Sequence, residues 1–138
     1  MPAVNYLAVL VSGVVIFMLG GLWYSPVLFA RRWMALMGKT EEDVKAAAAK
    51  SSMPLMYLSA FVCGLLSAWV LAILLNHFVN PTPLRGALVG ALCWLGFTGA
   101  TSYANAVFSM KPKALWLIDA GYYLVSFILA GVILAVWR

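Results

Sequence analysis

Charged residues are scarce in this chain of 138 residues, where Asp, Glu, Lys and Arg make up only 9% of all positions. Three long segments contain none of them, residues 4–24, 54–78 and 86–108, and a fourth, residues 114–137, contains Asp119 alone. Each segment has about the 20 residues that an α-helix needs to cross a hydrocarbon core. Hydrophobic residues account for 65% of the chain, which excludes an ordinary soluble domain. We therefore expect an all-α membrane protein with four transmembrane helices.

Metal ligands and catalytic bases are also scarce, because the chain has one His and two Cys. These are too few for a zinc or haem site. His77 ends the second segment on the side opposite to Asp119, so one subunit cannot assemble a Ser-His-Asp triad. We expect no cofactor, no metal site and no enzymatic activity. An enzyme acting on a lipid or a quinone is the least favoured of the functions considered.

Only residues 25–53 are long enough to form structure outside the bilayer, so we expect residues 1–138 to form a single integral membrane domain. The first segment is expected to remain in the mature protein. No basic residue precedes it, and Arg31 and Arg32 follow it in place of a small-residue cleavage site.

The distribution of basic residues predicts the orientation. Of the nine Lys and Arg residues, all except Arg85 and Arg138 lie in residues 25–53 and 109–113, two connections on the same side of a four-span protein. The positive-inside bias places these connections in the cytoplasm and both termini outside it. The net charge of +5 also suits a contact with anionic lipid headgroups. We do not expect nucleic-acid binding, because the basic residues are not interleaved with stacking aromatic residues.

The first cytoplasmic connection is predicted to contain two short helices. Residues 26–37 place apolar side chains on one side, as in a helix that lies in the membrane interface, and Gly38 can end this helix in a left-handed conformation. The expected interfacial anchors are Phe29, Trp33, Arg31 and Arg32. Thr40 then begins a polar helix with a sequence close to a capping box. A connector that keeps two spans in register is favoured over a docking surface for a partner.

The most unusual side chains of the four spans are expected at one level near the cytoplasmic side. At a rise of about 1.5 Å per residue, Asp119 lies about 8 Å inside its span. The candidate intramembrane polar cluster at this depth consists of Asp119, Asn105, Thr101, Tyr122, Tyr123 and Tyr24. An ionisable residue inside the membrane indicates a functional site. We favour the alternative of a hydrogen-bonded clasp, with Asn105, Thr101 or a tyrosine hydroxyl as donor and Lys113 within reach.

Glycines in the first and third spans predict close approaches between helices. The residues concerned are Gly20, Gly21, Gly86 and Gly90. Such residues serve packing within one subunit at least as often as they serve contacts between subunits. Because four spans enclose little cavity, a pathway for a solute would need two or more copies.

Three motifs together resemble one small bacterial family of four-span membrane proteins. They are LGGLWYSP at residues 19–26, followed by Phe29, Trp33 and Met34; TSYANAVF at residues 101–108; and IDAGY at residues 118–122. The family is catalogued as domain of unknown function 1761. The resemblance covers nearly the whole chain. It implies four spans and a bacterial origin, and it implies no activity. We expect the protein to lie in the bacterial inner (cytoplasmic) membrane.

Two functional hypotheses remain, from different classes. The first is an accessory or structural subunit that packs into a homo-oligomer or a larger membrane complex, with the lipid bilayer as its other partner. The second is a small oligomeric transporter or channel that uses Asp119 and the polar face of the third span. The absence of catalytic motifs, the short connections and the glycine-bearing helix faces favour the first.

Overall fold

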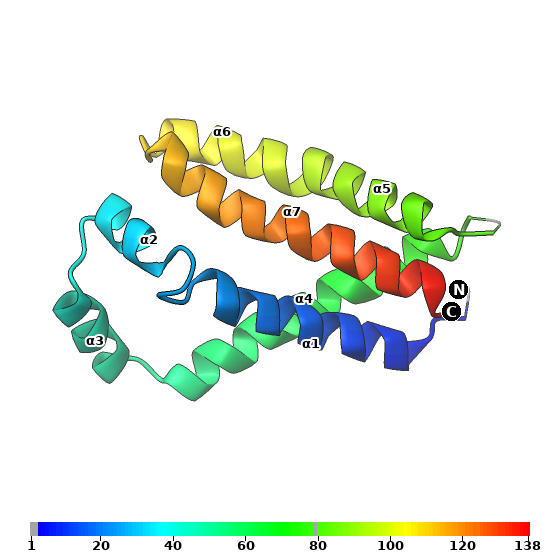
Figure 1. Ribbon diagram of the computed structural model, residues 1–138, viewed down its shortest axis with the longest axis horizontal. Helices are drawn as coiled ribbons and strands as arrows, with labels where there is room; N and C mark the ends of the chain where they lie inside the picture. Colours follow the sequence, from blue (N-terminus) through cyan, green and yellow to red (C-terminus); the bar gives the residue numbers. More distant parts are fainter. Residues whose placement is uncertain (1–2, 79) are drawn as a thin grey trace.

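The computed structural model describes residues 3–78 and 80–138, and these residues form helices joined by short connections (Figure 1). Four helical segments are long and apolar enough to cross a membrane, which confirms the predicted all-α four-span fold. They are α1 (Tyr6–Trp23), α4 (Met53–Leu75), α7 (Lys113–Val136) and the segment Pro83–Phe108. The last of these, the third span, is continuous but composite. It consists of α5 (Pro83–Cys93), the π-helical segment η1 (Trp94–Gly99) and α6 (Ala100–Phe108).

The third span ends at the predicted Phe108, and the other observed ends of the spans differ from the predicted ends by one to three residues. The side chain of Asn5 accepts hydrogen bonds from the backbone N–H groups of Leu7 and Ala8, at 3.1 Å each, and so caps the start of α1. Thr82 caps the third span in the same way, with Pro83 in the first helical turn. The third span therefore begins three residues before the predicted residue 86, because its cap lies outside the apolar run.

The fourth span, α7, is the central element of the bundle. It packs most extensively against α5 and also contacts α1 and α4, whereas α1 packs on α4. The core is built of small and medium side chains, with Ala8, Ala68, Leu75 and Ala130 almost fully buried. The third span touches α4 only slightly, so most of its surface is not covered by the other spans.

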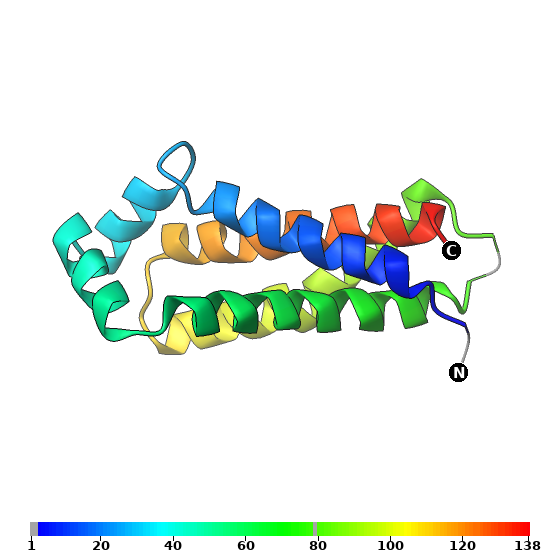
Figure 2. The same ribbon diagram turned by 90° about the horizontal axis from the view of Figure 1, so that it is seen from below.

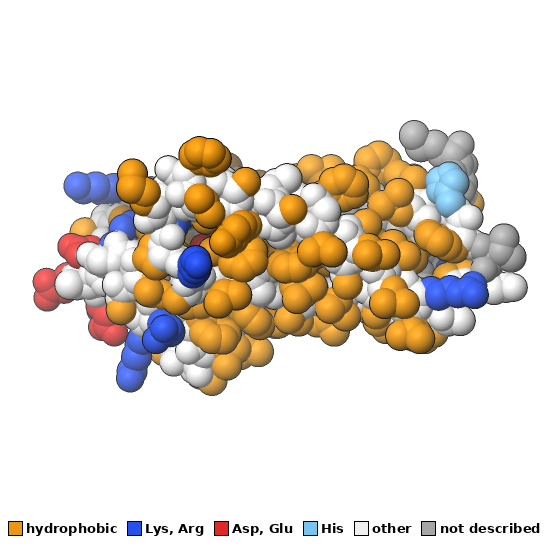
Figure 3. Space-filling view, turned by 90° about the horizontal axis from the view of Figure 1, so that it is seen from above, with side chains coloured by type: hydrophobic (Ala, Val, Ile, Leu, Met, Phe, Trp, Pro, Cys, Tyr) orange, Lys and Arg blue, Asp and Glu red, His pale blue; other side chains and the backbone are white. Residues whose placement is uncertain are grey.

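The two ends of the bundle differ in character. One end, which we call the hairpin end, carries α2 (Ala30–Met37) and α3 (Glu41–Lys50). The start of α1 and the end of α7 lie together at the other end, which we call the terminal end (Figures 1 and 2). On the face shown in Figure 3, hydrophobic side chains cover the middle of the molecule, and the charged side chains lie toward its ends. This distribution is that of a protein whose middle is surrounded by lipid.

The connection between α1 and α4 has the two predicted helices, with one correction. The first helix begins at Ala30, whereas the sequence predicted a start at residue 26. Residues 25–29 form turns instead, in which the backbone N–H groups of Leu28 and Ala30 both bond to the carbonyl oxygen of Ser25. Gly38 ends the helix at a φ of 68°, in the expected left-handed conformation.

The second helix of this connection has a complete capping box. The Thr40 hydroxyl accepts from the backbone N–H of Asp43 at 3.2 Å, and the Asp43 carboxylate accepts from the backbone N–H of Thr40 at 3.0 Å. Neither α2 nor α3 contains a buried residue. The stability of this hairpin therefore depends on local hydrogen bonds more than on burial.

Candidate functional site

Asp119 lies on α7, about 9 Å from the first residue of that helix at about 1.5 Å of rise per residue. Its Oδ1 atom accepts a hydrogen bond of 2.7 Å from the hydroxyl of Tyr24, the residue that follows the last turn of α1. This bond joins two residues that are 95 positions apart in the sequence. It ties the hairpin end of the first span to the fourth span.

Asp119 is the middle of three consecutive residues on α7 that accept hydrogen bonds from other spans. The indole Nε1 of Trp23 donates to the carbonyl oxygen of Ile118 at 2.9 Å. The indole Nε1 of Trp94, in η1, donates to the carbonyl oxygen of Ala120 at 2.8 Å. We call the donors Trp23, Tyr24 and Trp94 the aromatic clasp. Because a carbonyl oxygen has two lone pairs, these helical carbonyls can accept a second bond without losing the first.

Tyr122 extends this arrangement one turn further along α7. Its hydroxyl donates to the carbonyl oxygen of Ile16 at 2.7 Å, and its ring lies 5.8 Å from that of Tyr24 and 4.9 Å from that of Tyr123. A Cβ atom at Gly20 would come within 3.0 Å of the Tyr122 hydroxyl oxygen. The absence of a side chain at Gly20 therefore leaves room for this hydroxyl to reach α1.

The other residues of the predicted cluster do not bond to Asp119. The Thr101 hydroxyl is exposed and donates to the carbonyl oxygen of Phe97, four residues earlier in its own span, at 2.7 Å. Asn105 accepts from Ser109 at 3.5 Å. Lys113 forms no ion pair with Asp119 within the part of the chain that the structure describes. Of the three kinds of donor proposed for the clasp, the structure uses the tyrosine hydroxyl.

The π-helical segment is a feature of the site that the sequence analysis missed. A π-turn adds a residue to the helix repeat and rotates the side chains that follow it, and such turns are frequent at functional sites. In η1 the ring of Trp94 lies over Gly99, where a Cβ atom would be 3.0 Å from the ring. This small residue leaves space for the indole to turn toward α7.

Trp23 and Trp94 are further residues of the site whose role as hydrogen-bond donors was not predicted. A tryptophan with a buried ring usually finds an acceptor for its N–H group, and this rule was the available signal. Trp116 follows it as well, since it donates to the hydroxyl of Ser102 at 3.0 Å. The acceptors are backbone carbonyls in two of the three cases, which no side-chain pattern identifies.

Three cavities meet at Tyr24, Asp119 and Tyr123. The largest, of about 730 Å³, lies between α1, α4 and α7 and is lined by Tyr24, Tyr123 and other aromatic residues. A second, of about 570 Å³, lies under the α2–α3 hairpin and is lined by both Tyr24 and Asp119. A third, of about 120 Å³, is lined by Asp119 and Tyr123 together with Asn105 and Lys111. Asn105 therefore shares a cavity with Asp119 without a hydrogen bond to it.

The predicted interfacial anchors lie on and beside α2. The ring of Phe29 is 4.9 Å from that of Trp23, and the ring of Trp33 is 6.4 Å from that of Tyr24. Both side chains are half-buried against the end of α1, while Arg31 and Arg32 are exposed. Insertion of these two rings into lipid stays a prediction, and part of each ring is already covered by protein.

The glycines of the third span pack within the subunit. A Cβ atom at Gly86 would collide with the carbonyl oxygen of Gly131, and one at Gly90 would collide with the carbonyl oxygen of Phe127. Both glycines therefore allow α5 to lie directly against the backbone of α7. Gly21, by contrast, has open space where its side chain would be.

Comparison with known proteins identifies a family and no relative of known activity. The sequence model of the family described as "Protein of unknown function (DUF1761)" matches residues 7–135. No curated protein and no solved structure matches the chain. The matched range covers the four spans except for Tyr6 and Val136, and it contains the aromatic clasp and Asp119. The chain therefore belongs to the DUF1761 family of proteins of unknown function.

Proposed function

We propose that the protein is a non-catalytic structural subunit of a membrane assembly, and that Asp119 serves to hold its helices together. The observation that supports this is the aromatic clasp. Three consecutive residues of α7 accept hydrogen bonds from Trp23, Tyr24 and Trp94, so Asp119 and its two chain neighbours take part in helix–helix contacts. In a membrane such interhelical bonds stabilise the packed state and fix the positions of the spans.

The third span is the part of the protein that would meet a partner. It packs on α7 but scarcely on α4, and it leaves a face of four exposed leucines at helical spacing, Leu84, Leu88, Leu92 and Leu95. Gly86 and Gly90 are already used in the contact with α7. We propose that the leucine face packs against the third span of a second copy of the chain, which would bury this span on both sides.

Site-specific photo-crosslinking in native membranes tests this assembly. A photoreactive amino acid at Leu88, which is 53% exposed, is expected to give a covalent dimer of the 15.0 kDa chain. The matched control is Leu10, which is 45% exposed and lies on α1 near the same end of the bundle as Leu88. Crosslinks to a different protein at Leu88 would favour a larger complex over a homo-oligomer. Crosslinks to lipid alone, equal at both positions, would contradict an assembly through this face.

The orientation is proposed from charge, with the hairpin end in the cytoplasm of a bacterial cell and both termini outside it. The hairpin end carries α2 and α3 with their basic residues, and it is opposite the start of α1 and the end of α7 (Figure 1). Cysteine labelling on a cysteine-free background tests this. A cysteine at Lys45 should react with an impermeant reagent only in opened vesicles or cells. Reaction in intact cells would show that the protein has the opposite orientation.

Transport is the second candidate, and the three cavities around Tyr24 and Asp119 favour it. In this case the Tyr24–Asp119 bond would separate a space under the hairpin from a space among the spans. Asp119→Asn distinguishes the two candidates, because Asn keeps a hydrogen-bond acceptor and loses the charge. A structural role predicts a stable protein with unchanged assembly. Proton-driven transport predicts a stable protein whose solute or proton flux in liposomes is abolished.

A further inference from the structure

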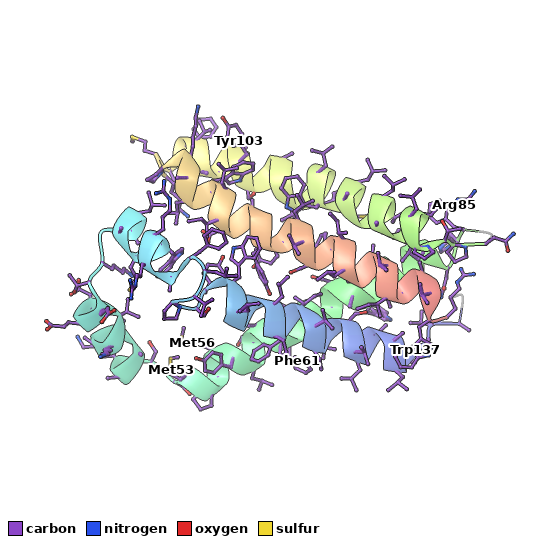
Figure 4. All side chains as sticks on the ribbon, viewed as in Figure 1. Met53, Met56, Phe61, Arg85, Tyr103 and Trp137 are labelled. Atoms are coloured by element: carbon purple, nitrogen blue, oxygen red, sulfur yellow. The ribbon has the colours of Figure 1, made fainter. Side chains whose placement is uncertain are left out.

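The cavity under the α2–α3 hairpin has the size of a small-molecule site. Its volume of about 570 Å³ falls within the range of about 300–1,000 Å³ that is typical of ligand pockets. Its walls include Asp119, Tyr24, Trp33, Met34, Met53 and Met56. Figure 4 shows Met53 and Met56 at the first turn of α4, beside the space that the hairpin encloses. We call this cavity the hairpin groove.

Asp119 is the one charged residue among the described residues that line the groove. Its carboxylate accepts one hydrogen bond, from Tyr24, and has no ion-pair partner in residues 3–78 and 80–138. Lys111 lines the smaller cavity on the other side of Asp119 and forms no ion pair with it. Arg31 and Arg32 are exposed on α2 and do not line the groove. A carboxylate held without a counter-ion in apolar surroundings favours the binding of a positive charge.

The remaining walls suit a cation that carries apolar groups. The rings of Trp33 and Tyr24 meet edge to face, at 6.4 Å and 81°, and offer two aromatic surfaces beside the carboxylate. Aromatic faces attract cations, and tryptophan does so most strongly. The three methionines are flexible and polarisable, so they can adapt to apolar groups of different shapes.

We propose that the hairpin groove binds a hydrophobic organic cation, such as a quaternary ammonium or phosphonium ion or a protonated amine with apolar substituents. The positive charge lies beside Asp119 and against the ring of Trp33, and the apolar groups contact Met34, Met53 and Met56. A metal ion fits less well, because no group of three or more His, Cys, Asp or Glu side chains occurs among the described residues. An acyl chain would make no use of the carboxylate. An anionic headgroup would be repelled by it.

Binding measurements on the full chain in nanodiscs of zwitterionic lipid test this proposal, which does not depend on the structural function proposed above. The probe is tetraphenylphosphonium, and tetraphenylborate is the control, because it has nearly the same shape and the opposite charge. Equilibrium dialysis with empty nanodiscs subtracts partition into lipid. We expect saturable binding of the phosphonium ion and none of the borate. Equal saturable binding of both ions would show an apolar groove without charge selection and would overturn the proposal.

Variants locate the bound cation. Asp119→Asn should weaken binding by at least about tenfold, and Trp33→Leu by about fivefold, as the loss of a charge and of an aromatic face requires. The matched controls are Glu42→Gln, an acid on α3, and Phe108→Leu, an aromatic residue at the hairpin end that is 86% exposed. Neither lines the groove, and both should stay within about twofold of the parent.

Met56→Lys keeps the test decisive if Asp119→Asn fails to fold. Met56 is 53% exposed and lies outside the aromatic clasp, so a lysine there should be tolerated and should supply a competing cation within the groove. Phosphonium binding should be lost in this variant while its thermal unfolding midpoint stays near that of the parent. Binding of parental strength in a folded Met56→Lys or Asp119→Asn protein would rule out this site. An unchanged affinity in Trp33→Leu would rule out the placement of the charge against the indole.

Discussion

The two halves of α7 are attached to the rest of the bundle in different ways. Near the hairpin end, Trp23, Tyr24 and Trp94 donate hydrogen bonds to Ile118, Asp119 and Ala120. Near the terminal end, α5 lies in close backbone contact with α7, with Gly86 and Gly90 against Gly131 and Phe127. The first contact is directional and polar. The second is possible only because Gly86 and Gly90 have no side chain.

This difference has consequences for stability and for position. In a bilayer, where lipid tails are as apolar as leucine, helix association depends on van der Waals packing and on interhelical hydrogen bonds. Close packing involves many atom pairs, and any added atom disrupts them together. Each hydrogen bond contributes about 1 kcal/mol and fixes one pair of groups. We therefore expect the glycine half to determine most of the stability of the α5–α7 pair, and the clasp half to determine how α1 is placed against α7.

The largest effect is expected from Gly90→Ala. A Cβ atom at this position collides with the carbonyl oxygen of Phe127, a backbone atom that can move only if the two helices separate. Overpacking of this kind should lower the free energy of unfolding by about 3 kcal/mol or more. The measurement is unfolding by dodecyl sulfate in mixed micelles. Gly21→Ala is the matched control, because nothing lies within 4 Å of the added atom, and it should be neutral or slightly stabilising.

A smaller but clear effect is expected from Asp119→Leu. This change leaves the half-buried Tyr24 hydroxyl without its acceptor, which should cost about 1 kcal/mol, the lower end of the range for an unpaired buried group. Asp119→Asn keeps an acceptor and should cost much less. Adding Tyr24→Phe to Asp119→Leu should restore part of the lost stability, because the unpaired hydroxyl is then gone. If Asn proves as damaging as Leu in the same unfolding assay, the charge itself stabilises the fold, and an ion pair replaces the clasp as the explanation.

Trp94→Phe tests the contribution of a single indole donor. The variant loses the bond to the carbonyl oxygen of Ala120 and should be destabilised by about 1 kcal/mol. Trp69→Phe removes the same atoms from a half-buried indole on α4 that forms no hydrogen bond among the described residues, so the difference between the two variants isolates the bond. Identical losses would mean that ring packing, rather than the hydrogen bond, holds η1 against α7.

The sequence predicted the four spans to within a few residues, because uninterrupted apolar runs identify membrane helices directly. It also predicted the Gly38 cap and the polar helix that begins at Thr40, since both depend on neighbouring residues. For Asp119, three donors were predicted as alternatives, Asn105, Thr101 and a tyrosine hydroxyl, and the structure has the hydroxyl of Tyr24. The hydroxyl of Thr101 is not a donor to Asp119, because it donates to a carbonyl oxygen of its own helix. Any threonine in a membrane helix can form such a bond. The π-helical segment could not be predicted, because it depends on how the Trp94 ring packs against Gly99 and α7.

The smallest effect is expected in the α2–α3 hairpin, in which no residue of either helix is buried. Hydrogen bonding with Thr40, above all the bond from its backbone N–H and then the interaction with its side chain, holds the pKa of the Asp43 carboxyl below its ordinary value of about 3.9. A carboxyl whose pKa is lower in the folded state stabilises α3 above the ordinary value, and this contribution is lost as the pH falls through the folded value. Acidification from neutral pH to below about 3.9 should therefore loosen the first turn of α3.

Amide hydrogen exchange at several pH values, corrected for the intrinsic rates, measures this loosening. Protection at the start of α3 should fall in acid, while protection in the middle of α7 stays unchanged, because no residue of α3 is buried against the bundle. Asp43→Asn should remove most of the pH dependence at these amides, and Glu42→Gln, one position away and outside the capping box, should retain it. A parallel loss of protection in α7 would show that the hairpin and the spans unfold as one unit. In that case the cooperative unfolding unit would include α2 and α3 as well as the four spans.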